Sequence, residues 1–122
     1  MKVWVFLGAF LGFFGVVLGA FGAHILRNQV STKAMEIFDT ASHYQMIHAL
    51  ALVAIGLLSY QGGSFFLNLG GWSFLVGTLL FSGSLYLLAV TEIKSLGQVT
   101  PVGGLLFLVG WASMAIHAWK QS

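Results

Sequence analysis

The sequence predicts an all-α membrane protein, a four-transmembrane-helix bundle with a short interfacial helix between the first two spans. Of its 122 residues, 58% are hydrophobic and only 7% are charged, whereas about 25% are charged in a typical soluble domain. Four stretches have the roughly 20 mainly apolar residues that a spanning helix needs: residues 3–23, 41–60, 66–90 and 101–119. We therefore expect a single four-helix transmembrane domain over residues 1–122.

The first span carries a stripe of glycines. They recur in steps of four and three, which places all of them on one helix face: Gly8, Gly12, Gly15, Gly19 and Gly22. Lipid gives helices little hydrophobic drive to associate, so a face that lets backbones approach closely is a helix-packing surface. We expect this face to meet another span of the same chain. The stripe also argues against a cleaved signal peptide, the alternative that Lys2 and the apolar run suggest.

The segment at residues 24–40 is the only long polar stretch. Apolar residues recur in it at helical spacing after a candidate N-cap, Ser31 or Thr32, so we expect an interfacial helix that runs into the second span. The short uncharged turn at residues 61–64 makes the second and third spans an antiparallel hairpin. Thr100 and Pro101 suit the start of the fourth span, where threonine can cap and proline fits the first turn.

Four spans put both termini and the turn at residues 61–64 on one side of the membrane, side A, and the two longer connections on the other, side B. Trp4, Tyr60 and Trp119 then lie near side A, as an aromatic belt would. The positive-inside rule does not fix the orientation, because lysine and arginine are split almost evenly between the two sides.

Polar side chains are costly in hydrocarbon, so those at membrane depth are the best indicators of a site. Most of them fall near side B, and we take these as candidate ligand- or ion-binding residues: His24, His43, Tyr44, Gln45, His48 and Glu92. His48 lies about 10 Å along the second span at 1.5 Å per residue, which places it inside the bilayer.

Three interpretations of this polar cluster stay open. Its members can hydrogen-bond to neighbouring helices and pin the bundle. The histidines and a carboxylate such as Glu92 can form a metal or proton site, although no recognised metal-binding motif is present. The cluster can also form a small-molecule or lipid-headgroup pocket, to which Arg27 and Lys33 add positive charge.

Composition and missing motifs exclude several function classes. Without cysteine there is no disulfide, thiolate metal site or cysteine nucleophile. The formal charge of +2 comes from scattered single cations, which argues against nucleic-acid binding. Motifs for nucleotide phosphates, nucleophile elbows and zinc proteases are missing. We therefore expect no enzymatic activity, and we assign no cofactor and no metal ligand.

The sequence thus indicates a polytopic membrane protein whose polar cluster at one membrane face stabilises the bundle or binds a small ligand or ion. The alternative is a small proton- or ion-coupled transporter or channel acting as an oligomer, but few polar residues lie at mid-depth to form a path. A redox enzyme would need paired histidines, and only His24 and His48 come close. The expected partners are membrane lipid and, as a possibility, further copies of the chain, but not nucleic acid.

Several short motifs stand out together: residues 19–24 (GAFGAH), 38–41 (FDTA), 44–45 (YQ), 48–52 (HALAL), 100–104 (TPVGG) and 110–111 (GW). As a set they resemble the domain of unknown function 423 family, small four-span membrane proteins of the UPF0382 type. The resemblance covers nearly the whole chain. It implies a four-helix fold and a multi-pass location in a bacterial inner membrane, and it assigns no activity, ligand or catalytic residue.

Overall fold

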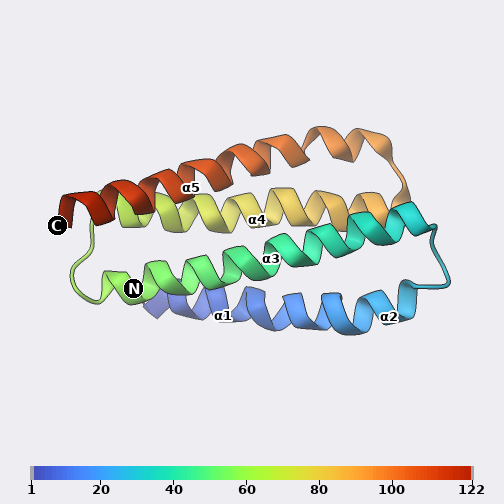
Figure 1. Cartoon of the computed structure of the whole chain (residues 1–122), viewed down its shortest axis with the longest axis horizontal. Coiled ribbons are helices and arrows are strands. Elements are labelled where there is room, and N and C mark those ends of the chain that lie inside the picture. Colours follow the sequence, from blue (N-terminus) through green and yellow to red (C-terminus); the bar gives the residue numbers. More distant parts are fainter. Residues whose placement is uncertain (1, 122) are drawn as a thin grey trace.

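The computed structural model describes residues 2–121, in which four long helical segments lie side by side (Figure 1). The first is α1 (Lys2–Val16), which continues through a π-helical segment, η1 (Val17–Gly22), into α2 (Ala23–Leu26). The others are α3 (Thr32–Ser59), α4 (Phe65–Thr91) and α5 (Thr100–Gln121), with a 3-10 helix, η2 (Lys94–Gln98), before α5. All four segments are long and apolar enough to cross a membrane, which confirms the predicted fold class.

The expected interfacial helix is the first part of α3. Of the two candidate caps, Ser31 is the one used, because its hydroxyl accepts a hydrogen bond from the Ala34 N–H at 3.1 Å. The 28 residues of α3 span about 42 Å at 1.5 Å per residue, more than the roughly 30 Å thickness of the hydrocarbon core. The polar first turns of α3 therefore extend beyond the hydrocarbon at side B.

The helices form a row in which α1 packs against α3, α3 against α4, and α4 against α5 (Figure 1). Both chain ends lie at side A, on the left of the figure, and the connections before α3 and before α5 lie at side B. The main core gathers buried side chains from all four spans, among them Leu11, Leu52, Phe74 and Phe107. Gln45 and His48 are among the polar residues of α3 that are buried in the bundle.

The glycine stripe of the first span lies against α3 along its whole length. A Cβ added at Gly8 would come within 2.8 Å of the Ala49 carbonyl oxygen and the Val53 backbone nitrogen, so the two backbones approach only because Gly8 has no side chain. At Gly12 the same atom would lie 3.9 Å from the Ala49 Cβ, an ordinary contact. The partner of this face is within the same chain.

The aromatic belt expected at side A is only partly present. Tyr60 and Trp119 are exposed there. Trp4 lies at the same end, but it is 4% exposed, and its ring packs on Gly71 and meets Trp72 edge-on with centroids 5.4 Å apart. Trp4 therefore lies at side A as predicted, but its ring packs between α1 and α4 instead of facing outward.

Candidate functional site

Gln45 joins α3 to both α1 and α4. Its amide Nε2 donates to the backbone carbonyl of Leu11 in the first span at 2.7 Å, and its Oε1 accepts from the Tyr86 hydroxyl of α4 at 2.6 Å. Gln45 is buried. Both polar atoms of the amide form hydrogen bonds to other helices. Such bonds contribute on average about 0.6 kcal/mol each to the stability of a membrane protein.

His48, one turn further along α3, joins this helix to α5. Its Nδ1 lies 2.8 Å from the Tyr44 carbonyl oxygen, and its Nε2 lies 3.0 Å from the indole Nε1 of Trp111. Because the indole N–H can only donate, Nε2 must accept, and the proton of the neutral ring lies on Nδ1, where it is donated to the carbonyl. The geometry assigns one tautomer.

The surroundings of His48 restrict what it can do chemically. Its ring is 3% exposed and stacks on Phe107, with ring centroids 3.6 Å apart and planes 6° apart. Both ring nitrogens are already used, so a metal ion at Nε2 would have to displace Trp111. Among residues 2–121, no group of three His, Asp or Glu side chains is arranged to hold a metal ion.

A groove between α3 and α5, the lateral groove, opens beside this histidine. Its volume is about 760 Å³. It is lined by His43, Tyr44, Ile47 and His48 of α3, by Phe81 of α4, and by Pro101, Gly104, Leu105, Phe107, Leu108 and Trp111 of α5. The rings of Tyr44 and Phe81 contact each other at a tilt of 38°, with centroids 4.6 Å apart. The groove is therefore mainly aromatic, with the exposed imidazole of His43 at its rim.

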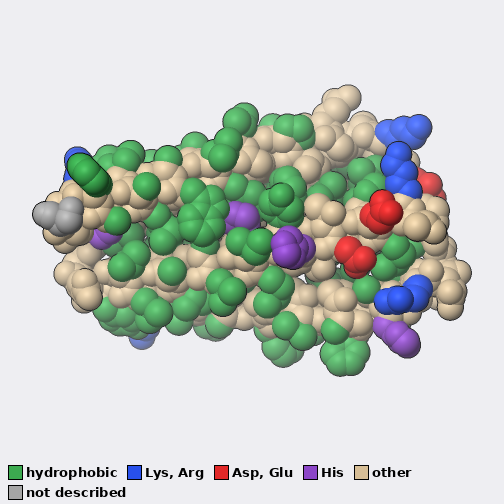
Figure 2. Space-filling model, in the orientation of Figure 1, with side chains coloured by type: hydrophobic (Ala, Val, Ile, Leu, Met, Phe, Trp, Pro, Cys, Tyr) green, Lys and Arg blue, Asp and Glu red, His purple; other side chains and the backbone are tan. Residues whose placement is uncertain are grey.

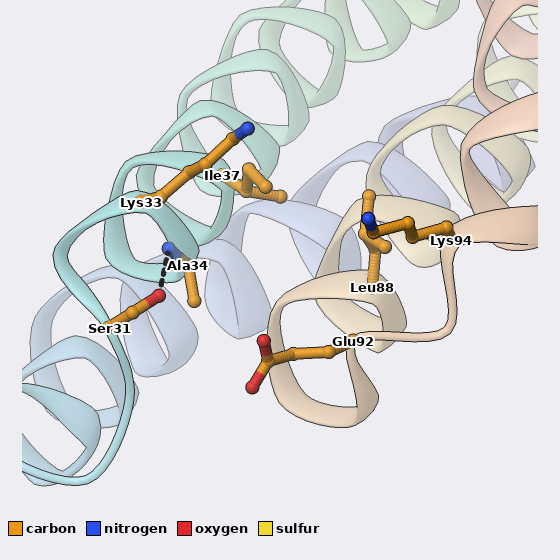
Figure 3. Close-up of a pocket in the computed structure, with 7 residues that line it drawn as sticks. All are labelled: Ser31, Lys33, Ala34, Ile37, Leu88, Glu92 and Lys94. Atoms are coloured by element: carbon orange, nitrogen blue, oxygen red, sulfur yellow. Dashed lines mark hydrogen bonds between the residues drawn. The ribbon is translucent and has the colours of Figure 1, made fainter.

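A second hollow, the side-B pocket, lies between the start of α3 and the end of α4 (Figure 3). Its volume is about 380 Å³, and it is lined by Ser31, Lys33, Ala34, Ile37, Leu88, Glu92 and Lys94. Glu92 ends α4 with a left-handed backbone conformation (φ 58°), and its N–H bonds to the Leu88 carbonyl at 2.8 Å. This turn brings the Glu92 and Lys94 side chains to the pocket.

A smaller hollow lies on the seam between α3 and α4, beside the side-B pocket. It has a volume of about 250 Å³ and shares Lys33 and Ile37 with the side-B pocket. Its other lining residues are Glu36, Thr40 and Leu85. Thr40 lies one helical turn before Tyr44, and Leu85 lies one turn after Phe81, but the hollow shares no lining residue with the lateral groove. Figure 2 shows all the acidic and several of the basic side chains visible in this view at the side-B end, with hydrophobic and histidine side chains along the middle.

The six candidate residues from the sequence fall in different places. His43, Tyr44 and His48 line the lateral groove, and Glu92 lines the side-B pocket. Gln45 is buried within the bundle, and His24 is exposed on α2 and lines none of these hollows. Their role in binding stays a prediction. Of the two cations expected at a headgroup pocket, Lys33 lines it and Arg27 does not.

Two residues that the sequence did not single out are hydrogen-bond donors to candidate residues. Trp111 donates a hydrogen bond to His48, and Tyr86 donates one to Gln45. Trp111 carried a usable signal, because it lies about 15 Å along the helix from Pro101 at 1.5 Å per residue. A tryptophan at this depth, away from the interface, needs an acceptor for its indole N–H. Lys94 is a single cation in a loop and gave no signal.

Four apolar spans held together by a buried polar network define this chain as a multi-pass membrane protein. Comparison with known proteins identifies the family: the chain belongs to the family described as protein of unknown function (DUF423), whose sequence profile matches residues 18–104. It is 46% identical to a UPF0382 membrane protein of Staphylococcus saprophyticus over 98% of this chain and 99% of the relative.

Other relatives extend over a similar length. The chain is 40% identical to the UPF0382 membrane protein YwdK of Bacillus subtilis, over 98% of each chain. It is 44% identical to a UPF0382 membrane protein of Haemophilus influenzae, over 94% of this chain and 92% of the relative. These names describe bacterial membrane proteins and mention no enzymatic activity. No solved structure matches the chain.

Proposed function

We propose that this protein is a non-enzymatic membrane protein that binds a lipid-like amphiphile, with the apolar part of the ligand in the lateral groove and its polar part at side B. One observation carries the proposal: the groove between α3 and α5 is mainly aromatic, and two hollows nearer side B, between the start of α3 and the end of α4, are lined by charged residues. A site that is apolar at membrane depth and charged at the interface has the polarity profile of an amphiphile.

The dimensions support this proposal. From Lys33 to His48 the site follows 15 residues of α3, about 22 Å at 1.5 Å per residue. One leaflet contributes about half of the roughly 30 Å hydrocarbon thickness, so this length suffices for a headgroup and an acyl chain. The volume of the lateral groove, about 760 Å³, lies within the range of small-molecule sites.

We propose that the protein is not an enzyme because the one serine–histidine pair among residues 2–121 has a structural role. The Ser64 hydroxyl lies 2.9 Å from Nδ1 of His117, as in a nucleophile–base pair. Such a base needs a third group to orient it, and the three acidic residues of the chain, Glu36, Asp39 and Glu92, all belong to the side-B end. Ser64 also accepts the Leu67 N–H at 3.1 Å as the N-cap of α4, which gives the pair a structural role.

The polar groups at mid-depth give little support to the transporter alternative, because Ser82 and Ser113 are bonded within the bundle. The Ser82 hydroxyl donates to the Ala41 carbonyl at 2.7 Å, and the Ser113 hydroxyl donates to the Val109 carbonyl at 2.8 Å. Both hydroxyls are buried and satisfied by backbone. Among the described residues only Thr78 has a buried side-chain oxygen without a partner. Purified protein in liposomes should therefore show no flux driven by a pH or ion gradient, and a saturable flux would favour the alternative.

A groove-filling substitution tests the proposed function. Gly104 lines the lateral groove, where an added Cβ makes only ordinary contact with Phe81 at 3.9 Å, so Gly104→Phe should fold and occupy the groove. Gly83→Phe is the matched control, because a Cβ there meets nothing within 4 Å and Gly83 lines none of the three hollows. Native mass spectrometry in mild detergent would measure retention of added phospholipid.

The proposal predicts saturable, stoichiometric lipid binding by the wild type and by Gly83→Phe. Gly104→Phe should weaken this binding by about tenfold, equivalent to about 1.4 kcal/mol. Equal retention by both variants, or retention that rises without saturation as nonspecific lipid does, would overturn it.

A further inference from the structure

We propose that the side-B pocket selects a zwitterionic phospholipid headgroup, with the phosphate held by Lys33 and Lys94 and a primary ammonium held by Glu92. This inference rests on the proposed function, because the pocket would recognise the polar end of the amphiphile whose chains occupy the lateral groove. It adds the chemical class of the ligand and the residues that would distinguish it from other lipids.

The order of charges in the pocket follows the order of charges in such a headgroup. In Figure 3 the Lys33 ammonium lies beside Ile37 and the Lys94 ammonium beside Leu88, and Lys33 and Ile37 also line the hollow on the seam between α3 and α4. The Glu92 carboxylate lies further out, facing Ser31 across the gap. A phospholipid has its phosphate next to the glycerol and its amine at the outer end, so each charge would meet its opposite.

The charge balance at side B favours a neutral headgroup over an anionic one. The cations of this end are Arg27, Lys33 and Lys94, and the acids are Glu36, Asp39 and Glu92. They cancel, and the formal excess of +2 therefore belongs to Lys2 and Lys120 at side A. Sites for anionic lipids instead gather about four to eight lysines and arginines. A zwitterion places no net charge in this neutral end.

A primary ammonium fits this pocket better than a quaternary one. The Glu92 carboxylate is an acceptor that an ammonium N–H can donate to, and charge-assisted hydrogen bonds of this kind are the stronger ones. A choline group has no N–H and is recognised mainly by aromatic rings. The residues that line the side-B pocket include no aromatic ring, since the rings lie deeper, in the lateral groove.

Four lipids with identical acyl chains separate these contributions in native mass spectrometry of the full chain: phosphatidylethanolamine, phosphatidylcholine, phosphatidylglycerol and diacylglycerol. We expect phosphatidylethanolamine to bind about three- to fivefold more tightly than phosphatidylcholine or phosphatidylglycerol, the size expected for an exposed charge contact. Diacylglycerol, which lacks the phosphate, should bind most weakly. Glycerophosphoethanolamine, which has the headgroup without chains, should not compete at equal concentration.

Charge variants assign the contacts. Glu92→Gln should remove the preference for phosphatidylethanolamine over phosphatidylglycerol, and the double variant Lys33→Gln with Lys94→Gln should reduce all phospholipids toward diacylglycerol. Asp39→Asn is the matched control, because it removes the same charge as Glu92→Gln from side B at a residue that lines none of the hollows there, so it should keep the wild-type order.

The outcomes separate the two proposals. Equal affinity for all four lipids, with binding still lost in Gly104→Phe, would overturn headgroup selection and leave the lateral groove as a lipid site. A wild-type preference for phosphatidylglycerol, or the same loss of selectivity in Asp39→Asn as in Glu92→Gln, would also overturn it. Absence of saturable binding for every lipid would refute the proposed function itself.

Discussion

Trp111→Phe tests whether the His48 contact stabilises the bundle. The variant removes the indole N–H that lies 3.0 Å from Nε2 and keeps a ring that can pack near Phe74. A side-chain hydrogen bond in a membrane protein contributes about 0.6 kcal/mol on average and up to about 1.7, while a buried acceptor left without a donor costs about 1–3 kcal/mol. His48 is 3% exposed, so water cannot replace the donor. We expect Trp111→Phe to lower the free energy of unfolding by about 1–2 kcal/mol.

Steric trapping in bicelles would measure this change, with Trp72→Phe as the matched control. Trp72 is 59% exposed, and phenylalanine there keeps a ring beside Trp4, so we expect a small effect. A double-mutant cycle with His48→Leu should give a coupling energy of about 0.6–1.7 kcal/mol. The ring ¹⁵N shifts of the wild type should report a proton on Nδ1. A coupling near zero, or a proton on Nε2, would refute the assigned hydrogen bond.

Three further predictions concern stability, read out by the same unfolding assay. Gly8→Ala should destabilise by about 1–3 kcal/mol because its Cβ meets α3 backbone at 2.8 Å, whereas Gly12→Ala should be neutral or stabilising; equal effects would contradict the close-packed stripe. Gln45→Leu should cost at least about 1 kcal/mol, since it removes two interhelical bonds, and an unchanged unfolding free energy would contradict this role. Glu92→Gly should stabilise by about 1 kcal/mol by relieving a φ of 58°, and a loss of stability would show that the side chain contributes more than the strain.

The spans could be predicted from the sequence because the bilayer sets their length and removes charge from them. The apolar runs therefore mark all four helices, and polar residues mark their ends at side B. The π-helical segment η1 could not be predicted. There the Ala23 N–H bonds to the Leu18 carbonyl, five residues back, and this change of hydrogen-bond partner leaves the apolar composition of the span unchanged.

The depth of the polar residues was predictable, but their partners were not. Gln45 and His48 are three residues apart, so their side chains point about 60° apart around α3. This rotation is enough to send Gln45 toward α1 and α4 and His48 toward α5. Which helix lies in each direction depends on the packing of the whole row, which no local pattern of α3 contains.

The side-B pocket could also be predicted only in part. Charges near side B indicated such a pocket, and Lys33 and Glu92 were among the residues singled out. The choice of Lys94 over Arg27 depends on how the chain leaves α4. The left-handed turn at Glu92 directs the next residues back across the helix end, and only the three-dimensional path of this loop brings Lys94 to the pocket.

Nuclear Overhauser effects between a protonated phospholipid and the protein in deuterated detergent test the proposed binding of lipid in the lateral groove most directly. At substoichiometric lipid, acyl-chain protons should give contacts to the methyl groups of Ile47, Leu105 and Leu108, which line the lateral groove. The exposed methyl groups of Leu79 and Leu87 on α4, outside the groove, should give none. Contacts of equal strength to both sets would mean that lipid surrounds the bundle without a preferred site, and would contradict the proposed function.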